Sequence, residues 1–180
     1  MFQDEAVMVK IMLPKIETIL YTTGLSPHAP YVFRYALALA SQHRAKIVAV
    51  HAIEPLTPFG KSLVEQYISP ESSLELHTKA RETVTSQLKK RIERLCNEEC
   101  NNAPSCENAV ASIHVLEGYS DQVILNMAEE CSADVIVMGA RRHSRVGEFM
   151  LGSTTRKVLH SASQPVFVVK IPKGYKEEFK

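Results

Sequence analysis

Short apolar segments alternate along the chain with longer segments in which apolar residues recur at helical spacing. The short segments are rich in Val and Ile and are nearly continuous in their apolar character. This is typical of strands in a parallel sheet that is covered on both faces. We therefore expect five buried strands, at residues 18–23, 45–53, 111–118, 133–140 and 165–171.

The intervening segments predict helices with one apolar face. Phe33, Leu37 and Ala40 follow Pro30, a residue suited to the first turn of a helix. A second, charged helix is expected from about Pro70 to Cys96. Its predicted apolar face consists of Val84, Leu88, Ile92 and Leu95.

Two further helices have recognisable beginnings. Ser120 is a candidate N-cap, and Asp121 is favourable in the first turn that follows it. Gly152 and Ser153 open the last helix, which carries Val158 on its apolar face.

Strict alternation of strands and helices predicts an α/β fold, namely an open five-stranded, mainly parallel sheet with helices on both faces. The length of 180 residues fits one domain, which we expect to span residues 1–180. The segment 54–73 holds three prolines and a glycine and is long for a strand-to-helix connection. It predicts a surface loop or lid, with a disordered insertion as the alternative.

The charge balance gives no reason to expect nucleic acid or a membrane as a partner. The formal net charge is +1, and no apolar run approaches the roughly 20 residues that span a bilayer. The first residues include Asp4 and Glu5 and do not resemble a signal peptide, so a cytoplasmic location is expected.

Cys96, Cys100 and Cys106 cluster in the sequence, but their spacing does not match the CxxC pairs of common zinc sites. Free thiols are the simplest expectation in a reducing compartment, with a zinc site or a local disulfide left open. Of the other polar residues, Asp134 is expected to serve the turn into the fourth strand. His51 is expected to be packed or hydrogen-bonded, and His28 to be solvated or to reach a ligand.

The loop after the fourth strand has features of an anion site. It begins at Gly139 and ends at Gly152 and Ser153, where a helix start offers backbone N–H groups and the positive end of a dipole. The hydroxyls of Ser153 and Thr154 can donate to phosphate oxygens. The alternative is purely structural, with Ser153 as an N-cap and Gly139 as a turn.

The sequence as a whole resembles the universal stress protein family, from about Ile19 to Lys170. The stretches that carry the resemblance are ILYTTGLSPHA, YALALASQHRAKIVAVHAI, EGYSDQVILNMAEECSADVIVMGA, LGSTTRKVL and QPVFVVK.

The nucleotide-binding branch of that family carries the pattern G-x2-G-x9-G-[ST] after the fourth strand. Its first glycine corresponds to Gly139, its third to Gly152 and its Ser/Thr to Ser153. Arg142 stands at the second glycine, and Gly24 stands where the family often has an aspartate near the adenosine. Arginine is a strong phosphate ligand, but it lacks the close backbone approach that glycine allows. The resemblance therefore implies weaker binding than in a member with the intact pattern.

The ligand implied by the resemblance is ATP or another adenine nucleotide, with or without magnesium. Its phosphates are expected to lie against Gly139, Gly152, Ser153 and Thr154, with Arg142 nearby. Its adenosine is expected to lie by Thr22, Thr23, Gly24 and Ala52, with Met138 lining the base pocket.

The first functional hypothesis is a stress-responsive regulatory module that binds this nucleotide and at most hydrolyses ATP slowly. The alternative is a dimeric stress-related interaction protein that has lost nucleotide binding. A third hypothesis, a nucleotide-using enzyme, requires a catalytic acid or nucleophile that is not evident in the sequence. The resemblance also implies a homodimer in which the last strand, 165–171, pairs with its copy in antiparallel orientation.

Overall fold

The structure is a computed structural model. It describes residues 13–55, 57, 62, 70–102, 108–140, 151–172 and 175, and for residues 70–81 the backbone alone.

Five parallel strands form one sheet in the order β3-β2-β1-β4-β5, which confirms the predicted fold class. Each strand lies within two residues of the boundaries expected from the apolar pattern. The strands are β1 (Thr18–Thr22), β2 (Lys46–Ile53), β3 (Val110–Glu117), β4 (Val135–Gly139) and β5 (Val166–Val169).

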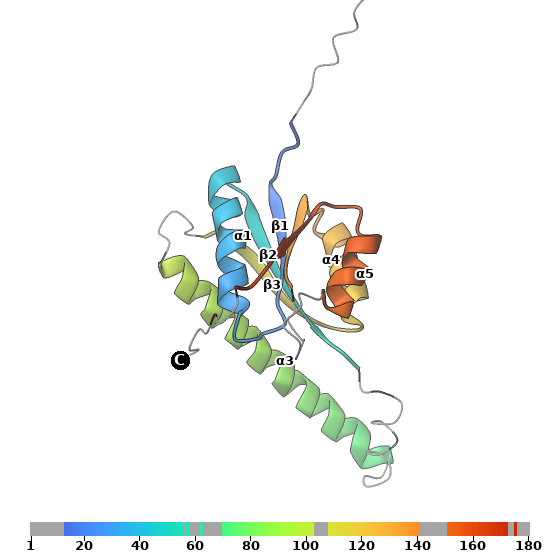
Figure 1. Cartoon of the computed structure of the whole chain (residues 1–180). Coiled ribbons are helices and arrows are strands. Elements are labelled where there is room, and N and C mark those ends of the chain that lie inside the picture. Colours follow the sequence, from blue (N-terminus) through green and yellow to red (C-terminus); the bar gives the residue numbers. More distant parts are fainter. Residues whose placement is uncertain are drawn as a thin grey trace, which may run out of the picture.

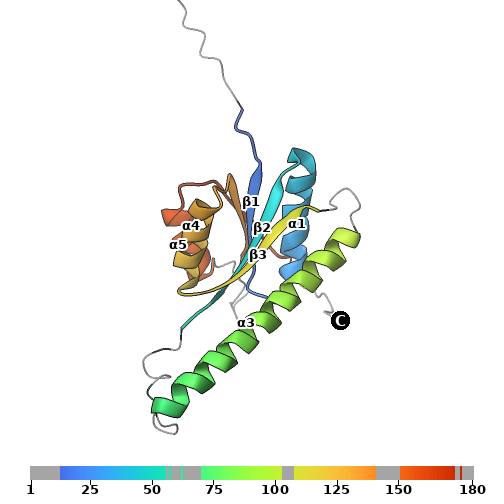
Figure 2. The ribbon, with the colours of Figure 1, turned by 180° about the vertical axis from the view of Figure 1, so that it is seen from behind.

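The helices cover both faces of the sheet. One side carries α1 and α3, and the other carries α4 and α5 (Figures 1 and 2). Their bounds are α1 Ala29–His43, α3 Pro70–Asn101, α4 Ser120–Glu130 and α5 Ser153–Ser161.

Two hydrophobic cores lie on the two sides of the sheet, because side chains alternate along each strand. Ile19 and Tyr21 point into the core beneath α1 and α3, and Leu20 points into the core beneath α4 and α5. The hydroxyl of Tyr21 donates to the carbonyl of Ala29 at 3.0 Å. Burial raises the pKa of Tyr21, so its phenol remains a protonated donor that ties the central strand to the start of α1.

The long helix α3 extends past the sheet at its amino-terminal end (Figures 1 and 2). Its 32 residues span about 48 Å, and strands of four to eight residues cannot cover that length. Ile92 and Leu95 are buried as expected, but Val84 is 45% exposed. None of the helices within the described residues is long and apolar enough to cross a bilayer.

Two sequence expectations on helix starts need correction. Because α3 begins at Pro70, residues 70–73 are helical and do not belong to the loop expected over 54–73. Most of that segment lies outside the described residues. The N-cap of α4 is Tyr119, not Ser120, whose hydroxyl instead donates to the carboxylate of Glu54 at 2.7 Å.

Asp134 joins the start of β1 to the start of β4. Its Oδ2 accepts the backbone N–H groups of Glu17 at 2.7 Å and Thr18 at 2.8 Å, and its own N–H donates to the carbonyl of Thr18. These segments are more than 100 residues apart in sequence. Asp134 therefore lies at the turn into the fourth strand, as predicted, and its hydrogen bonds also hold the start of β4 beside the start of β1.

Replacing Asp134 with Ala should destabilise the fold by about 2 kcal/mol, because two backbone donors at the sheet end lose a charged acceptor. Urea unfolding followed by circular dichroism measures this change. Lys15→Ala is the matched control, since it breaks only an exposed ion pair with Glu17 and should change stability little. Equal losses in both variants would contradict the assignment.

Candidate functional site

The chain leaves the neighbouring strands β1 and β4 toward opposite faces of the sheet. The connection after β1 enters α1 on one face, and β4 leads to α5 on the other. Because β1 and β4 are adjacent while their connections diverge, their carboxyl ends form the switch point at which open α/β sheets receive ligands in a crevice. The predicted site residues that the structure describes are on the segments that border this crevice.

Thr22, Ala52 and Met138 belong to the face of the sheet that carries α4 and α5, at the ends of three adjacent strands. Thr22 of β1 pairs with Val50 of β2, which lies two residues before Ala52. On the other side, Tyr21 pairs with Val137, so Met138 is the residue of β4 beside Thr22. Thr22 and Ala52 are half-buried, whereas Met138 is only 3% exposed within the core. Small side chains therefore form the accessible floor, and Met138 supports it from within the core.

Thr23 fixes the loop that follows β1. Its N–H donates to Val50 O at 3.0 Å, and its hydroxyl oxygen accepts the N–H of Leu25 at 3.1 Å. His51 Nδ1 lies 2.7 Å from the carbonyl of Thr23. Because a carbonyl only accepts, Nδ1 of His51 carries a proton. This confirms the expectation of a hydrogen-bonded His51, whose ring joins the end of β1 to β2.

Gly24 leaves open space beside this loop. It is exposed, and a Cβ built on it would meet no heavy atom within 4 Å. Its φ is not left-handed, whereas the following Leu25 has a φ of 51°. A larger side chain at position 24, including the aspartate that the family often has, therefore fits without a clash or a backbone cost.

The end of β4 is in close contact with helices from both faces. The buried hydroxyl of Thr155, in the first turn of α5, donates to Gly139 O at 3.4 Å. A Cβ on Gly139 would lie 3.0 Å from Cγ2 of Val32 in α1. A side chain here would force Val32 to shift by a few tenths of an ångström, so glycine suits the close approach of α1, and its φ is not left-handed.

Gly152 is the N-cap of α5, with φ −60° and ψ 157°, and its carbonyl accepts the N–H of Arg156 at 3.0 Å. Ser153 is the first helical residue. It is exposed, and Gly152, as the N-cap, has no side chain that could cap this helix. The alternative interpretation of Ser153 as an N-cap is therefore wrong. The first N–H groups of the helix have no intrahelical acceptor and are available as donors to an anion.

Arg142 lies outside the described residues, together with Arg141, His143 and Arg145. The expected position of Arg142 near the phosphates therefore stays a prediction. The sequence reasoning missed Thr155 and Val32, the two side chains that hold the helices against Gly139. The run Ser153-Thr154-Thr155 was a signal for the first of them, since three hydroxyl residues begin this helix. The contact of Val32 had no signal, because it depends on the packing of α1.

Comparison with known proteins identifies the family. The universal stress protein family model matches residues 15–170. The chain belongs to the universal stress protein family. A universal stress protein of Thermus aquaticus is 30% identical over 155 residues, which cover 86% of this chain and 98% of that protein.

Solved structures of family members share the fold. One is the protein MJ0577, with a TM-score of 0.67 and 22% identity, covering 89% of this chain and all of that one. Another is a universal stress protein in complex with cAMP, with a TM-score of 0.54 and 17% identity, covering 87% and 98% of the two chains.

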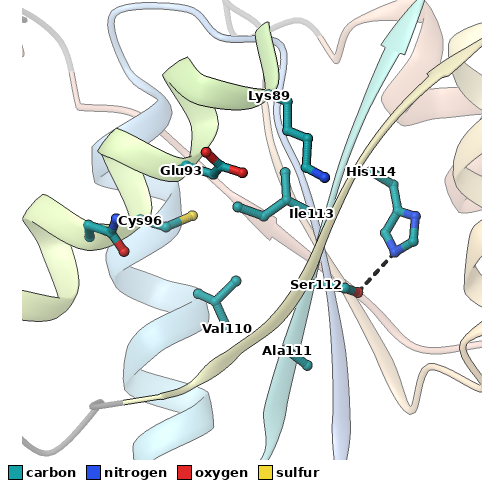
Figure 3. Close-up of a pocket in the computed structure, with 9 residues that line it drawn as sticks. Lys89, Glu93, Cys96, Val110, Ala111, Ser112, Ile113 and His114 are labelled. Atoms are coloured by element: carbon teal, nitrogen blue, oxygen red, sulfur yellow. Dashed lines mark hydrogen bonds between the residues drawn. The ribbon is translucent and has the colours of Figure 1, made fainter. Parts of the chain in front are cut away.

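The structure of the present chain has a pocket of about 520 Å³ that lies away from the crevice, between α3 and the first half of β3 (Figure 3). Lys89, Glu93 and Cys96 line it from α3, and Ile113 from the edge strand. The side chain of His114 is hydrogen-bonded to that of Ser112, with 2.9 Å between Nε2 and Oγ. Because this pocket is beside the amino-terminal half of a strand, it is not the position where such sheets bind nucleotides.

Cys96, Cys100 and Cys131 are free thiols, as expected for the simplest case, and Cys106 lies outside the described residues. No group of three metal-ligating side chains occurs within the described part of the chain. Burial raises the pKa of Cys96 to about 12. This thiol is therefore almost wholly protonated near neutral pH and is a poor nucleophile.

Iodoacetamide at pH 8 should modify Cys131 well before Cys96. Cys96 is 2% exposed and, with its raised pKa, holds almost no thiolate below about pH 11. Peptide mass spectrometry over time measures both rates in one sample, and labelling in urea serves as the control. If Cys96 reacts as fast as Cys131 in the native protein, the buried thiol is wrongly assigned.

Proposed function

We propose that this chain is a regulatory module that binds an adenine nucleotide at the crevice between β1 and β4. The observation that carries the proposal is the uncapped start of α5 beside Gly139, at the point where the connections diverge. The complex of a structural neighbour with cAMP supports the ligand class. The proposed role is binding and signalling in the cytoplasm, with at most slow hydrolysis of ATP.

In this proposal the phosphates accept N–H groups from the start of α5 and hydroxyl groups from Ser153 and Thr154. The positive end of the helix dipole favours their charge, and each charge-assisted bond contributes about 1.5–3 kcal/mol. Arg142 adds a guanidinium to the same anion. Ala52 and Thr22 form the floor beneath the adenosine, and Thr23 and Gly24 border it.

The missing aspartate lowers the affinity that we expect. Gly24 offers no side-chain acceptor to a ribose hydroxyl or to a base N–H group. Because no atom lies within 4 Å of a Cβ at this position, Gly24→Asp should restore an acceptor without displacing a neighbour. The site then differs from a strong nucleotide site mainly by the residues at positions 24 and 142.

Isothermal calorimetry with ATP, with and without magnesium, tests the site. Combining Gly152→Val with Ser153→Ala should abolish binding, because the cap is obstructed and a donor is lost. Gly24→Asp should tighten binding by about tenfold, the equivalent of one added hydrogen bond. Ser161→Ala is the matched control, since Ser161 is exposed at the opposite end of the same helix.

Arg142→Gly separates two roles of the arginine. Binding weakens if the guanidinium is a phosphate ligand, and it strengthens if the side chain obstructs the phosphates. Absence of heat with both the wild type and the Gly24→Asp, Arg142→Gly double variant would exclude the site. The alternative of an interaction protein without a nucleotide would then stand.

A homodimer through segment 165–171 is the second part of the proposal. β5 is at one edge of the sheet, where its outer backbone groups have no neighbouring strand among the described residues. Phe167 is 39% exposed on this strand, and Val166 and Val168 are half-buried. An apolar strand at an edge favours pairing with another strand. The resemblance to the family supports an antiparallel pair of β5 strands.

Val168→Lys should weaken the dimer by roughly tenfold or more, because a charge is placed in the paired edge. Sedimentation velocity over a concentration series measures the dissociation constant. Ala111→Lys adds the same charge to the exposed opposite edge, at β3, and should leave the dimer unchanged. A chain that is monomeric at every concentration, or that responds only to Ala111→Lys, would contradict pairing through β5.

A further inference from the structure

The chain continues past the family match, which ends at residue 170, and returns to the surface of α1. Ile171 is 7% exposed and belongs to the core beneath α1 and α3. The N–H of Tyr175 donates to the carbonyl of Pro172 at 3.3 Å, which turns the chain back. We call Ile171, Pro172 and Tyr175 the C-terminal strap.

Tyr175 contacts three residues, spaced three apart in the sequence, at the start of α1. Its ring centroid lies 4.6 Å from that of Tyr31 and 6.1 Å from that of His28. Its hydroxyl accepts a hydrogen bond from Nη1 of Arg34 at 3.2 Å. Residues 28, 31 and 34 follow helical spacing. The strap therefore lies across the junction between the β1–α1 loop and the first turns of α1.

The helix surface under the strap is held rigidly. Arg34 forms a bidentate pair with Glu99 of α3, with Nε to Oε2 at 2.6 Å and Nη2 to Oε1 at 2.9 Å. Glu99 is only 9% exposed. Because planar, bidentate pairs orient the guanidinium, Arg34 presents its remaining N–H groups in a fixed direction. Tyr175 thus rests on a surface built from two helices.

The side chain of His28 lies at this junction and makes few polar contacts. It is the N-cap of α1, yet its side chain caps no backbone N–H group. Its Nδ1 is buried and has no hydrogen-bond partner among the described residues. The orientation of the His28 ring therefore depends on its contact with the ring of Tyr175, because Nδ1 makes no hydrogen bond among the described residues.

His28 closes the loop that begins at Thr23, and this loop contains a strained residue. Leu25 has a φ of 51°, which a leucine adopts only when its surroundings require it. Its side chain is buried, and its N–H is held by the hydroxyl of Thr23. The other end of the loop has backbone hydrogen bonds from Ala29 to Ser26 and from Val32 to His28, and the ring of His28 packs against the strap.

We propose that the C-terminal strap holds the β1–α1 loop, residues 23–28, in the conformation that receives the adenosine of a nucleotide. Tyr175 is then a positioning residue that acts through His28 and does not touch the ligand. The proposal rests on the proposed function for its ligand, while the effect on the loop exists without nucleotide. The strap lies beyond residues 15–170, which the family model matches.

Hydrogen exchange of the nucleotide-free protein tests the effect on the loop. Tyr175→Ala should increase exchange at residues 24–32 and leave the β2 amides at 47–50 unchanged. Tyr175→Phe keeps the ring, removes the hydroxyl that accepts from Arg34, and should restore most of the protection. Val84→Ala is the control, since it removes an exposed apolar side chain of α3. Unchanged exchange at 24–32 in Tyr175→Ala would overturn the proposal.

Calorimetry with ATP tests the consequence for binding. Tyr175→Ala should weaken binding by roughly fivefold, in the range of typical coupling between sites, and Tyr175→Phe should bind nearly as the wild type. Faster exchange with unchanged ATP affinity would overturn the positioning role. If the wild type itself binds no ATP, the proposed function fails, and exchange alone decides whether the strap holds the loop.

Discussion

The side-by-side pairing of β1 and β4 is the constraint on which the rest of the structure depends. Ile19, Leu20 and Tyr21 are completely buried and pair with Val135, Ile136 and Val137. Asp134 fixes the start of this pairing, because its carboxylate accepts N–H groups that precede and begin β1. β1 leads to β2 on one side of this pair and β4 leads to β5 on the other, so right-handed crossovers place the two connections on opposite faces. The crevice is therefore a result of strand order and requires no special loop.

The sequence predicted the elements well because their signals are local. Runs of Val and Ile identify buried strands, and Gly152 followed by hydroxyl residues identifies a helix start. The order of the strands is different in kind, because apolar periodicity does not specify which strand lies beside β1. The strand order was not predicted, and the pairing of Ile19 with Val135 shows that β4 lies beside β1.

The errors arose where a local rule met a tertiary contact. Ser120 is a good N-cap by type, but its hydroxyl donates to Glu54 from another segment. Val84 follows the apolar spacing of α3 but is 45% exposed. Tyr175 had no sequence signal, because its contacts are with residues about 140 positions earlier in the chain. Local patterns predict an element and its apolar face, and long-range packing decides what that face meets.

Gly24 and Gly139 show that the same residue type serves different physical needs in one site. At Gly24 the left-handed conformation falls on the neighbouring Leu25, and the space beside the glycine is open. At Gly139 the space is filled by Val32 on one side, and the hydroxyl of Thr155 bonds to the carbonyl. The first position is open to substitution, and the second is closed by packing.

The contact between Gly139 and Val32 also has an evolutionary consequence. The 3.0 Å spacing makes the two positions a single steric unit, although they are on different elements. A methyl group gained at position 139 requires volume to be lost at position 32. Related sequences with alanine or serine at the first position should therefore carry a smaller residue at the second. Covariation between this glycine and the first turn of α1 would then be a record of how closely the helix crosses the strand.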